Sequence, residues 1–361
     1  MKKNRIQAIL LLGILLVNLP LFFDIYRQCA FNIVPHDDYV PYLLYILGEG
    51  GSIPNSPTGY RFLSVLIAAP FYYMLPLFKY SLLEGVSDEY LKGLEALSFV
   101  SYLAASLSAF FIYKISKKKF KGPENTAILA ALITLFLFRF TAIYSVDPTR
   151  SKQVNIASLS LFTAIYSVDP TAIFLICVLL YYLDSKWIFA FLIILSVGVN
   201  EKIAFLFFML FGGRQFWKNV TGQSIYFLFS IIAFLIYFLI RKTIDLPGHE
   251  YMVQPSMFFE KATHTIKLLF TMKSFMLNWI PGIMTLGLFF LALKEYKEIP
   301  KHNKLYFSPI DFLPIIGFIV IALITDMQYT IGRILLFCFP LYLPLATLYI
   351  VRLLKKTTNI G

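Results

Sequence analysis

The sequence predicts an all-α, polytopic membrane protein with about ten transmembrane helices, and its composition is the first reason. Of its 361 residues, 58% are hydrophobic and 14% are charged, whereas an ordinary soluble domain has about 45–50% apolar and about 25% charged residues. The aromatic share is 17%, which is typical of helices that meet lipid and its interfaces. This composition excludes a cytosolic globular enzyme.

The second reason is a series of long apolar runs. A helix needs about 20 apolar residues to cross the roughly 30 Å hydrocarbon core of a bilayer. Ten candidate runs cover residues 6–23, 93–113, 126–146, 163–183, 187–199, 203–213, 224–240, 277–293, 309–325 and 331–350. The first run follows a basic segment, but no small-residue cleavage site comes after it, so we expect an uncleaved anchor rather than a secretory signal.

The stretch 59–80 is apolar as well, and the charges after it decide its placement. If this stretch lies at the outer interface, kinked at Pro70 and Pro76, the lysine cluster at 114–121 and every later short basic connection fall on the inner side. Short cytoplasmic loops carry an excess of Lys and Arg. We therefore predict that 59–80 is juxtamembrane.

The resulting map is a single transmembrane domain, 1–361, with juxtamembrane helices in its first outer loop. Both termini are expected in the cytoplasm, the two large outer loops are 24–92 and 241–276, and no separate soluble domain is expected. The formal net charge of +12 is then mainly a topology signal, and no nucleic-acid partner is needed to explain it. We expect the protein to be integral to the plasma (inner) membrane.

The cysteines indicate neither a disulfide framework nor a metal centre. Cys177 and Cys338 lie inside apolar runs, where a thiol behaves as a small hydrophobe. Cys29 is then a lone exposed thiol, and no Cys/His spacing is typical of zinc. No cofactor is expected, and no divalent metal is implied.

Polar residues, two of them charged, interrupt the apolar sequence at Asn200, Glu201 and Lys202. The flanking runs 187–199 and 203–213 would rise only about 20 and about 17 Å as helices. Charged residues within the hydrocarbon region of a membrane are usually tolerated where they face a protein-lined or watery cavity. Two interpretations stay open: an ordinary turn between helices with different ends, or a recessed polar floor below the outer surface.

The first outer loop carries adjacent carboxylates, Asp37 and Asp38, before Tyr39. Adjacent carboxylates repel, so one of them tends to have a raised pKa unless a cation or ligand lies beside it. A carboxylate at the membrane face can act as a general base toward an acceptor hydroxyl. The alternative is a solvated loop start in which an Asp caps the short segment 39–48.

A ten-residue segment, FTAIYSVDPT, occurs at 140–149 and again, identically, at 162–171. Such identity indicates a recent tandem duplication, or an engineered or sequence-assembly insertion. Only the second copy continues into an apolar run, so we expect Asp169 to cap a helix that has Pro at its first position. Asp147, in the first copy, could compete for the same place.

Arg333 stands on the outer side, at the start of the last candidate span. An arginine there could bind phosphate through two hydrogen bonds. It could equally be an interfacial residue whose stem covers apolar surface.

Taken in order, these features resemble the GT-C class of integral membrane glycosyltransferases, and within it the protein mannosyltransferase and lipid A aminoarabinose transferase branch. The order is an N-terminal helix, an outer loop with Asp37-Asp38, a Pro/Gly-Tyr segment at 57–60 and a basic inner loop. An outer Tyr-Ser-Val-Asp-Pro turn, the broken helices around 200–202 and a late Arg before Phe339-Pro340 complete it. The resemblance covers roughly residues 1–350.

The resemblance implies a transferase that moves a sugar from a polyprenyl-phosphate donor to an acceptor hydroxyl at the outer membrane face, in cell-envelope glycan or glycolipid assembly. Asp37 or Asp38 would be the base, and Lys202 and Arg333 would bind the phosphate. Asp169 or Asp147 would shape the acceptor side. The remaining members of the implied substrate-binding set are His36, Arg61 and Glu201.

The implied partners are a polyprenyl-phosphate sugar donor, a glycan, lipid or protein acceptor, and membrane lipids. Two features depart from the family: no soluble domain follows the last helix, and the duplication interrupts one motif. Two other functions stay open. A polysaccharide polymerase or ligase would place several essential arginines in a late outer loop, where only Arg241 stands, and a lipid-linked-sugar transporter or flippase would show inverted repeats.

Overall fold

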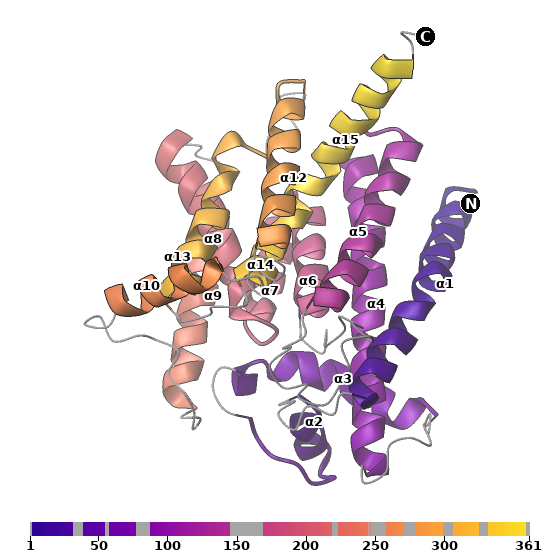
Figure 1. Cartoon of the computed structure of the whole chain (residues 1–361), viewed down its shortest axis with the longest axis vertical. Coiled ribbons are helices and arrows are strands. Elements are labelled where there is room, and N and C mark those ends of the chain that lie inside the picture. The colour runs from indigo at the N-terminus through magenta and orange to yellow at the C-terminus, as the bar shows by residue number, and fades with distance from the viewer. Residues whose placement is uncertain are drawn as a thin grey trace.

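The protein is a bundle of helices, seen in a computed structural model of the whole chain (Figure 1). The structure describes residues 2–31, 39–54, 58–76, 87–144, 169–218, 223–244, 246, 258–270, 279–298, 306–324 and 331–358. Every regular element in these ranges is a helix. The all-helical fold that the sequence predicts is therefore confirmed for the described part of the chain.

Four of the described helices are long and apolar enough to cross a membrane. They are Arg5–Asp24 within α1, Asp88–Lys118, which is α4, Ser224–Thr243, which is α9, and Leu336–Thr358. All ten predicted runs coincide at least in part with helices, but the other six are not among the four long apolar helices, so the count of about ten spans stays a prediction.

The first half of the chain gathers around α4 (Asp88–Lys118). Ser87 caps this helix, since its hydroxyl accepts a hydrogen bond from the Tyr90 amide. The helix carries acids in its first turn and lysines in its last turn, as the helix dipole favours. Helix α1 (Lys2–Phe31) runs antiparallel to it: Phe22 packs against Phe99, whereas Asn18, one turn earlier in α1, donates to Ser106, about two turns later in α4. Helices α5 (Glu124–Tyr144) and α6 (Asp169–Tyr181) pack on α4 as well.

Two short helices cover one end of this bundle: α2 (Tyr39–Leu47) and α3 (Phe62–Met74), with the single-turn η1 (Thr58–Tyr60) between them. Figure 1 shows them at the lower end, far from both termini. With 13 residues, α3 rises only about 20 Å, too little to cross about 30 Å of hydrocarbon. The juxtamembrane placement of 59–80 stays a prediction.

The second half of the chain adds helices beside α6. They are α7 (Lys186–Ser196), α8 (Glu201–Lys218), α9 (Ser224–Thr243), α10 (Phe258–Leu269), α12 (Ile280–Tyr296), η6 (Pro309–Phe312), α13 (Leu313–Ile324), α14 (Ile331–Leu335), η7 (Leu336–Cys338) and α15 (Phe339–Thr358). Helices α12 and α15 pack along each other, as do α8 and α9.

Several connections meet at the end of the bundle opposite α3, which we call the basic end: residues 117–124, 182–186, 214–218, 294–298 and 352–356. Lys119 and Tyr306 both bind Asp184, and Arg352 binds Glu295 across α15 and α12 at 2.7 Å. Both chain termini lie toward this end in Figure 1. The common side predicted for the short basic connections agrees with this arrangement.

Two predicted helix boundaries are wrong, and one predicted loop contains a helix. Helix α8 begins at Glu201 rather than at 203 and continues to Lys218, so it rises about 27 Å and holds both charged residues in its first turn. The predicted loop 241–276 contains a helix, α10. The predicted run 331–350 is broken at η7, because Pro340 supplies no amide for the carbonyl of the residue four before it and crowds that turn.

The other local predictions agree with the structure where it describes them. Helix α6 begins at Asp169, in the second copy of the duplicated segment, and the first copy begins in the last turn of α5. Cys177 and Cys338 are buried, as expected of thiols inside apolar runs.

Candidate functional site

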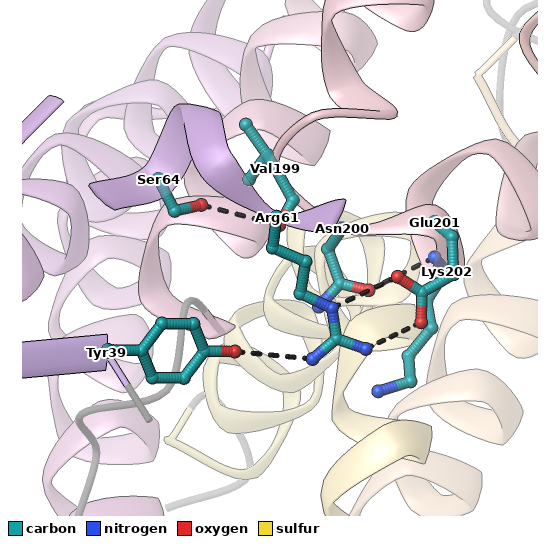
Figure 2. A network of polar contacts seen from close by, with 7 residues as sticks. All are labelled: Tyr39, Arg61, Ser64, Val199, Asn200, Glu201 and Lys202. Carbon is teal, nitrogen blue, oxygen red and sulfur yellow. Dashed lines mark hydrogen bonds and ion pairs between the residues drawn. The ribbon is translucent and has the colours of Figure 1, made fainter. Parts of the chain in front are cut away.

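The candidate site is centred on an ion pair between Arg61 and Glu201. The guanidinium makes two hydrogen bonds to the carboxylate, Nε to Oε2 at 3.1 Å and Nη2 to Oε1 at 2.6 Å. Paired bonds of this kind are the strong form of an arginine–carboxylate contact. The two side chains are 10% and 18% exposed, so the pair is recessed without being sealed (Figure 2).

Backbone contacts explain why these two residues, 140 positions apart, meet. Arg61 immediately precedes α3, and the first turn of α3 lies on the connection between α7 and α8. The Leu63 amide donates to the Gly198 carbonyl at 2.9 Å, and the Ser64 hydroxyl donates to the Val199 carbonyl at 3.3 Å. A side chain at Gly198 would come within 3.1 Å of Leu63 Cβ, so a glycine is what allows this approach.

A second cation, Lys202, follows Glu201 in the first turn of α8. Its backbone amide donates a hydrogen bond to Asn200 Oδ1 at 3.1 Å, so the Asn200 side chain caps the start of the helix. Its ammonium points away from α3 (Figure 2) and lies 5.9 Å from the ring centroid of Phe337 in η7. With Arg61, Glu201 and Lys202 together, the cluster carries one net positive charge.

Glu201 is the fixed anion of this cluster. Burial by itself raises the pKa of this carboxyl, but the charges of Arg61 and Lys202, with the hydrogen bonds from Arg61, outweigh burial and lower the pKa to about 2. Glu201 is the first residue of α8 and lies outside the four helices long enough to cross a membrane. A carboxylate with so low a pKa cannot accept a proton near neutral pH, so Glu201 holds cations rather than acting as a base.

The first outer loop reaches the cluster through Tyr39. The Arg61 Nη1 atom donates to the Tyr39 hydroxyl at 3.4 Å, a long bond that Figure 2 shows on the side away from Glu201. Tyr39 is the first residue of α2 and directly follows Asp38 in the chain. A partly buried cluster of two cations and one carboxylate can hold an anion such as phosphate.

Of the residues that the sequence singles out, the structure brings together Arg61, Glu201 and Lys202. His36, Asp37, Asp38 and Asp147 lie outside the described residues. Asp169 and Arg333 lie at the start of α6 and within α14, but their side chains are outside the described part of the structure. Arg333 precedes Phe337, the ring near Lys202, by four positions.

Of the two interpretations of residues 200–202, the different helix ends are confirmed, since α8 begins at Glu201, while the recessed polar floor stays a prediction, which the burial of this segment supports. Asn200 is fully buried, and its Nδ2 atom has no hydrogen-bond partner in the described residues. A buried amide of this kind costs free energy unless water or a ligand binds it. The turn between α7 and α8 is therefore buried rather than solvated at Asn200.

A second arginine pair was not predicted. Arg214 Nε and Nη2 donate to the two carboxylate oxygens of Asp311 at 2.7 and 2.6 Å, and both side chains are almost fully buried. The sequence did contain a signal for Asp311, since Ser308-Pro309-Ile310-Asp311 is a capping-box spacing, and the Ser308 amide does donate to Asp311 Oδ2 at 2.7 Å.

No three His, Cys, Asp or Glu side chains gather as a metal centre within the described ranges. Compared with protein-family models, with curated proteins and with solved structures, the chain matches none. The site must therefore be interpreted from its own geometry.

Proposed function

We propose that the protein is a multi-pass membrane glycosyltransferase that moves a sugar from a polyprenyl-phosphate donor to an acceptor hydroxyl at the outer membrane face. The observation that carries the proposal is the Arg61–Glu201–Lys202 cluster, in which two cations and one carboxylate lie partly buried at the start of α3 and α8. In the proposed orientation the basic end faces the cytoplasm, and α2 and α3 lie at the outer face, in accord with the excess of Lys and Arg in cytoplasmic loops.

A membrane location is supported by the surfaces of the peripheral helices. In the most apolar windows of α1 and α9, only 22% of the residues are buried within the protein. Large side chains on these helices, such as Ile9, Leu16 and Leu239, are more than half exposed. Continuous apolar surface of this extent is expected where helices face lipid.

In the proposed reaction the acceptor hydroxyl attacks the anomeric carbon of the donor sugar, and the bond from that carbon to the phosphate oxygen breaks. Asp37 or Asp38 takes the hydroxyl proton. The ammonium of Lys202, with Arg333, stabilises the charge on the departing lipid phosphate. Arg61 and Glu201 hold the first turn of α8, and with it Lys202, against α3.

The test compares four single variants, D37N, D38N, K202Q and K242Q, in purified protein with a panel of short-chain polyprenyl-phosphate sugars. Lys242 lies exposed in the last turn of α9, outside the cluster, so K242Q is the matched loss of one positive charge. We expect K202Q to bind polyprenyl phosphate at least about tenfold more weakly, as loss of a charge-assisted contact implies. D37N or D38N should abolish sugar release while binding persists, and K242Q should change neither.

The proposal is wrong if K202Q binds polyprenyl phosphate as wild type does, or if both aspartate variants keep full transfer activity. Movement of intact lipid-linked sugar across vesicles without cleavage of the donor would instead indicate a transporter. Growth of a glycan chain on a lipid pyrophosphate would indicate a polymerase or ligase.

A further inference from the structure

We propose a second site, at the basic end of the bundle, that binds the phosphate group of an anionic membrane lipid between Lys114, Lys118 and Tyr181. The site lies where the last turns of α4 pack against the end of α6, opposite the candidate active site. The inference needs the four long helices to lie in a bilayer, but it does not depend on the proposed transferase activity.

The central observation is a cluster of three lysine ammonium groups around one aromatic ring. The Nζ atoms of Lys114, Lys118 and Lys119 lie 5.6, 4.9 and 5.3 Å from the ring centroid of Tyr181. A cation within about 6 Å of a ring is attracted by the π electrons, and Lys114 also lies 4.7 Å from the ring centroid of Phe110. The ammonium groups repel one another, so an anion bound between them would lower the electrostatic energy.

The carboxylates nearby neutralise only part of this charge. Lys119 is 5% exposed and pairs with Asp184, which also accepts a hydrogen bond from Tyr306. Lys117 pairs with Glu124 at 2.7 Å. Within the described part of the chain, Lys114 and Lys118 have no carboxylate partner, so four lysines and two acids leave two positive charges.

Lys114 and Lys118 are four residues apart on one face of α4, as two neighbouring positions of a helix surface are. Lys118 donates to the Tyr181 hydroxyl at 3.3 Å, which leaves the hydroxyl proton of Tyr181 free to point elsewhere. Two ammonium groups and one hydroxyl donor form a three-point set for the oxygens of a phosphate. Lys119, which is buried and paired with the exposed Asp184, lies beside these three groups.

The aromatic residues at this end indicate a lipid source for the phosphate. Helix α7 starts two residues after Asp184, and its second residue, Trp187, is 78% exposed. Exposed Trp beside Lys is typical of the headgroup level of a bilayer. Lys118 is exposed and Lys114 is half-buried, so a headgroup at that level can reach both ammonium groups.

The experiment measures binding of NBD-labelled phosphatidic acid to the purified full chain in zwitterionic detergent micelles, by fluorescence anisotropy. The test variant is the double substitution K114Q/K118Q. The control is K355Q/K356Q, which removes two exposed lysines from the last turn of α15, also at the basic end. Labelled phosphatidylcholine reports binding that does not need an anionic headgroup.

We expect K114Q/K118Q to weaken binding at least about tenfold, as loss of charge-assisted phosphate contacts implies, and K355Q/K356Q to change it less than about twofold. Tyr181→Phe keeps the ring and removes the hydroxyl, so a smaller but measurable weakening should follow in a protein that is folded like wild type. Thermal unfolding without anionic lipid should be the same for all variants.

Equal weakening by the two double substitutions would overturn the proposal, because only the total charge would then matter. Wild-type affinity in both K114Q/K118Q and Tyr181→Phe would overturn it as well. Displacement of the probe by millimolar inorganic phosphate would contradict the lipid assignment and indicate a soluble phosphate compound instead.

Discussion

Each end of the bundle holds an arginine that is paired with a carboxylate. The two pairs share the same hydrogen-bond pattern but differ in their exposure to solvent and in the residues around them. Arg214 and Asp311, near the basic end, are 2% and 0% exposed, whereas Arg61 and Glu201, beneath α3, are 10% and 18% exposed. Both pairs have two hydrogen bonds between guanidinium and carboxylate. The distances alone do not separate a structural pair from a functional one.

The surroundings do separate them. The Asp311 carboxylate also accepts the Ser308 amide, and the Asp311 carbonyl accepts the Tyr342 hydroxyl at 2.7 Å, so the pair joins α8, η6 and α15. Beside Glu201 there is instead a second cation, Lys202, and a loose 3.4 Å contact to Tyr39. A sealed pair with satisfied oxygens stabilises the fold, while a partly open pair with surplus charge is suited to hold a ligand.

The largest effect should come from Asp311→Asn, which leaves the Arg214 charge buried without its partner. Breaking a buried pair in this way typically costs about 3–5 kcal/mol, so thermal unfolding in detergent should shift well below that of wild type. The double variant R214M/D311L should recover most of the loss, because apolar side chains of similar volume can replace a buried pair. If Asp311→Asn unfolds like wild type, the pair is not structural.

Glu201→Gln should lower the stability less than Asp311→Asn does, and it should lower the activity more. Its pair is partly open to solvent, so we expect a loss of about 1–3 kcal/mol, smaller than for Asp311→Asn under the same scan conditions. Transfer of sugar and binding of polyprenyl phosphate should both fall, because α8 and Lys202 are no longer held by Arg61. Equal stability losses in the two variants would remove the distinction between the pairs.

A smaller difference in stability should appear between the tyrosines that contact the two pairs, Tyr342 and Tyr39. Tyr342→Phe removes a buried hydrogen bond to Asp311 and should cost about 1 kcal/mol. Tyr39→Phe weakens a contact to Arg61 that is already long, at 3.4 Å, and the loss of this contact should lower the unfolding temperature less than the loss of the Tyr342 bond. The reverse order would mean that the first outer loop contributes more to stability than the 3.4 Å distance indicates.

The smallest effect concerns pH. A pKa lowered from 4.5 to about 2 means that the Glu201 pair contributes stability that is fully present above about pH 4.5 and is lost only as the pH falls toward 2. The difference in unfolding temperature between wild type and Glu201→Gln should therefore be constant from pH 7 to pH 5. A difference that shrinks over this range would show that Glu201 is protonated there and is not a fixed anion.

Much of the helical framework was predictable because it depends on local sequence. Apolar length placed helices at α4, α9 and α12 within a few residues, and the interruption at Glu201 and Lys202 was visible as charge inside apolar sequence. The break at η7 was missed because Pro340 was treated as part of an apolar run rather than as a residue without an amide. Helix α10 was missed because its polar residues read as a loop.

Hydropathy and charge are summed over neighbouring residues, so the amino-acid sequence was enough to predict a protein of apolar helices with its basic connections on a common side. Which charges pair with each other depends on the packing of the helices. Arg61 and Glu201 are separated by 140 positions and Arg214 and Asp311 by 97, and no local pattern encodes such a pairing. The partner of a charge in an apolar bundle is set by which helix ends pack against each other, since an unpaired buried charge is too costly to persist.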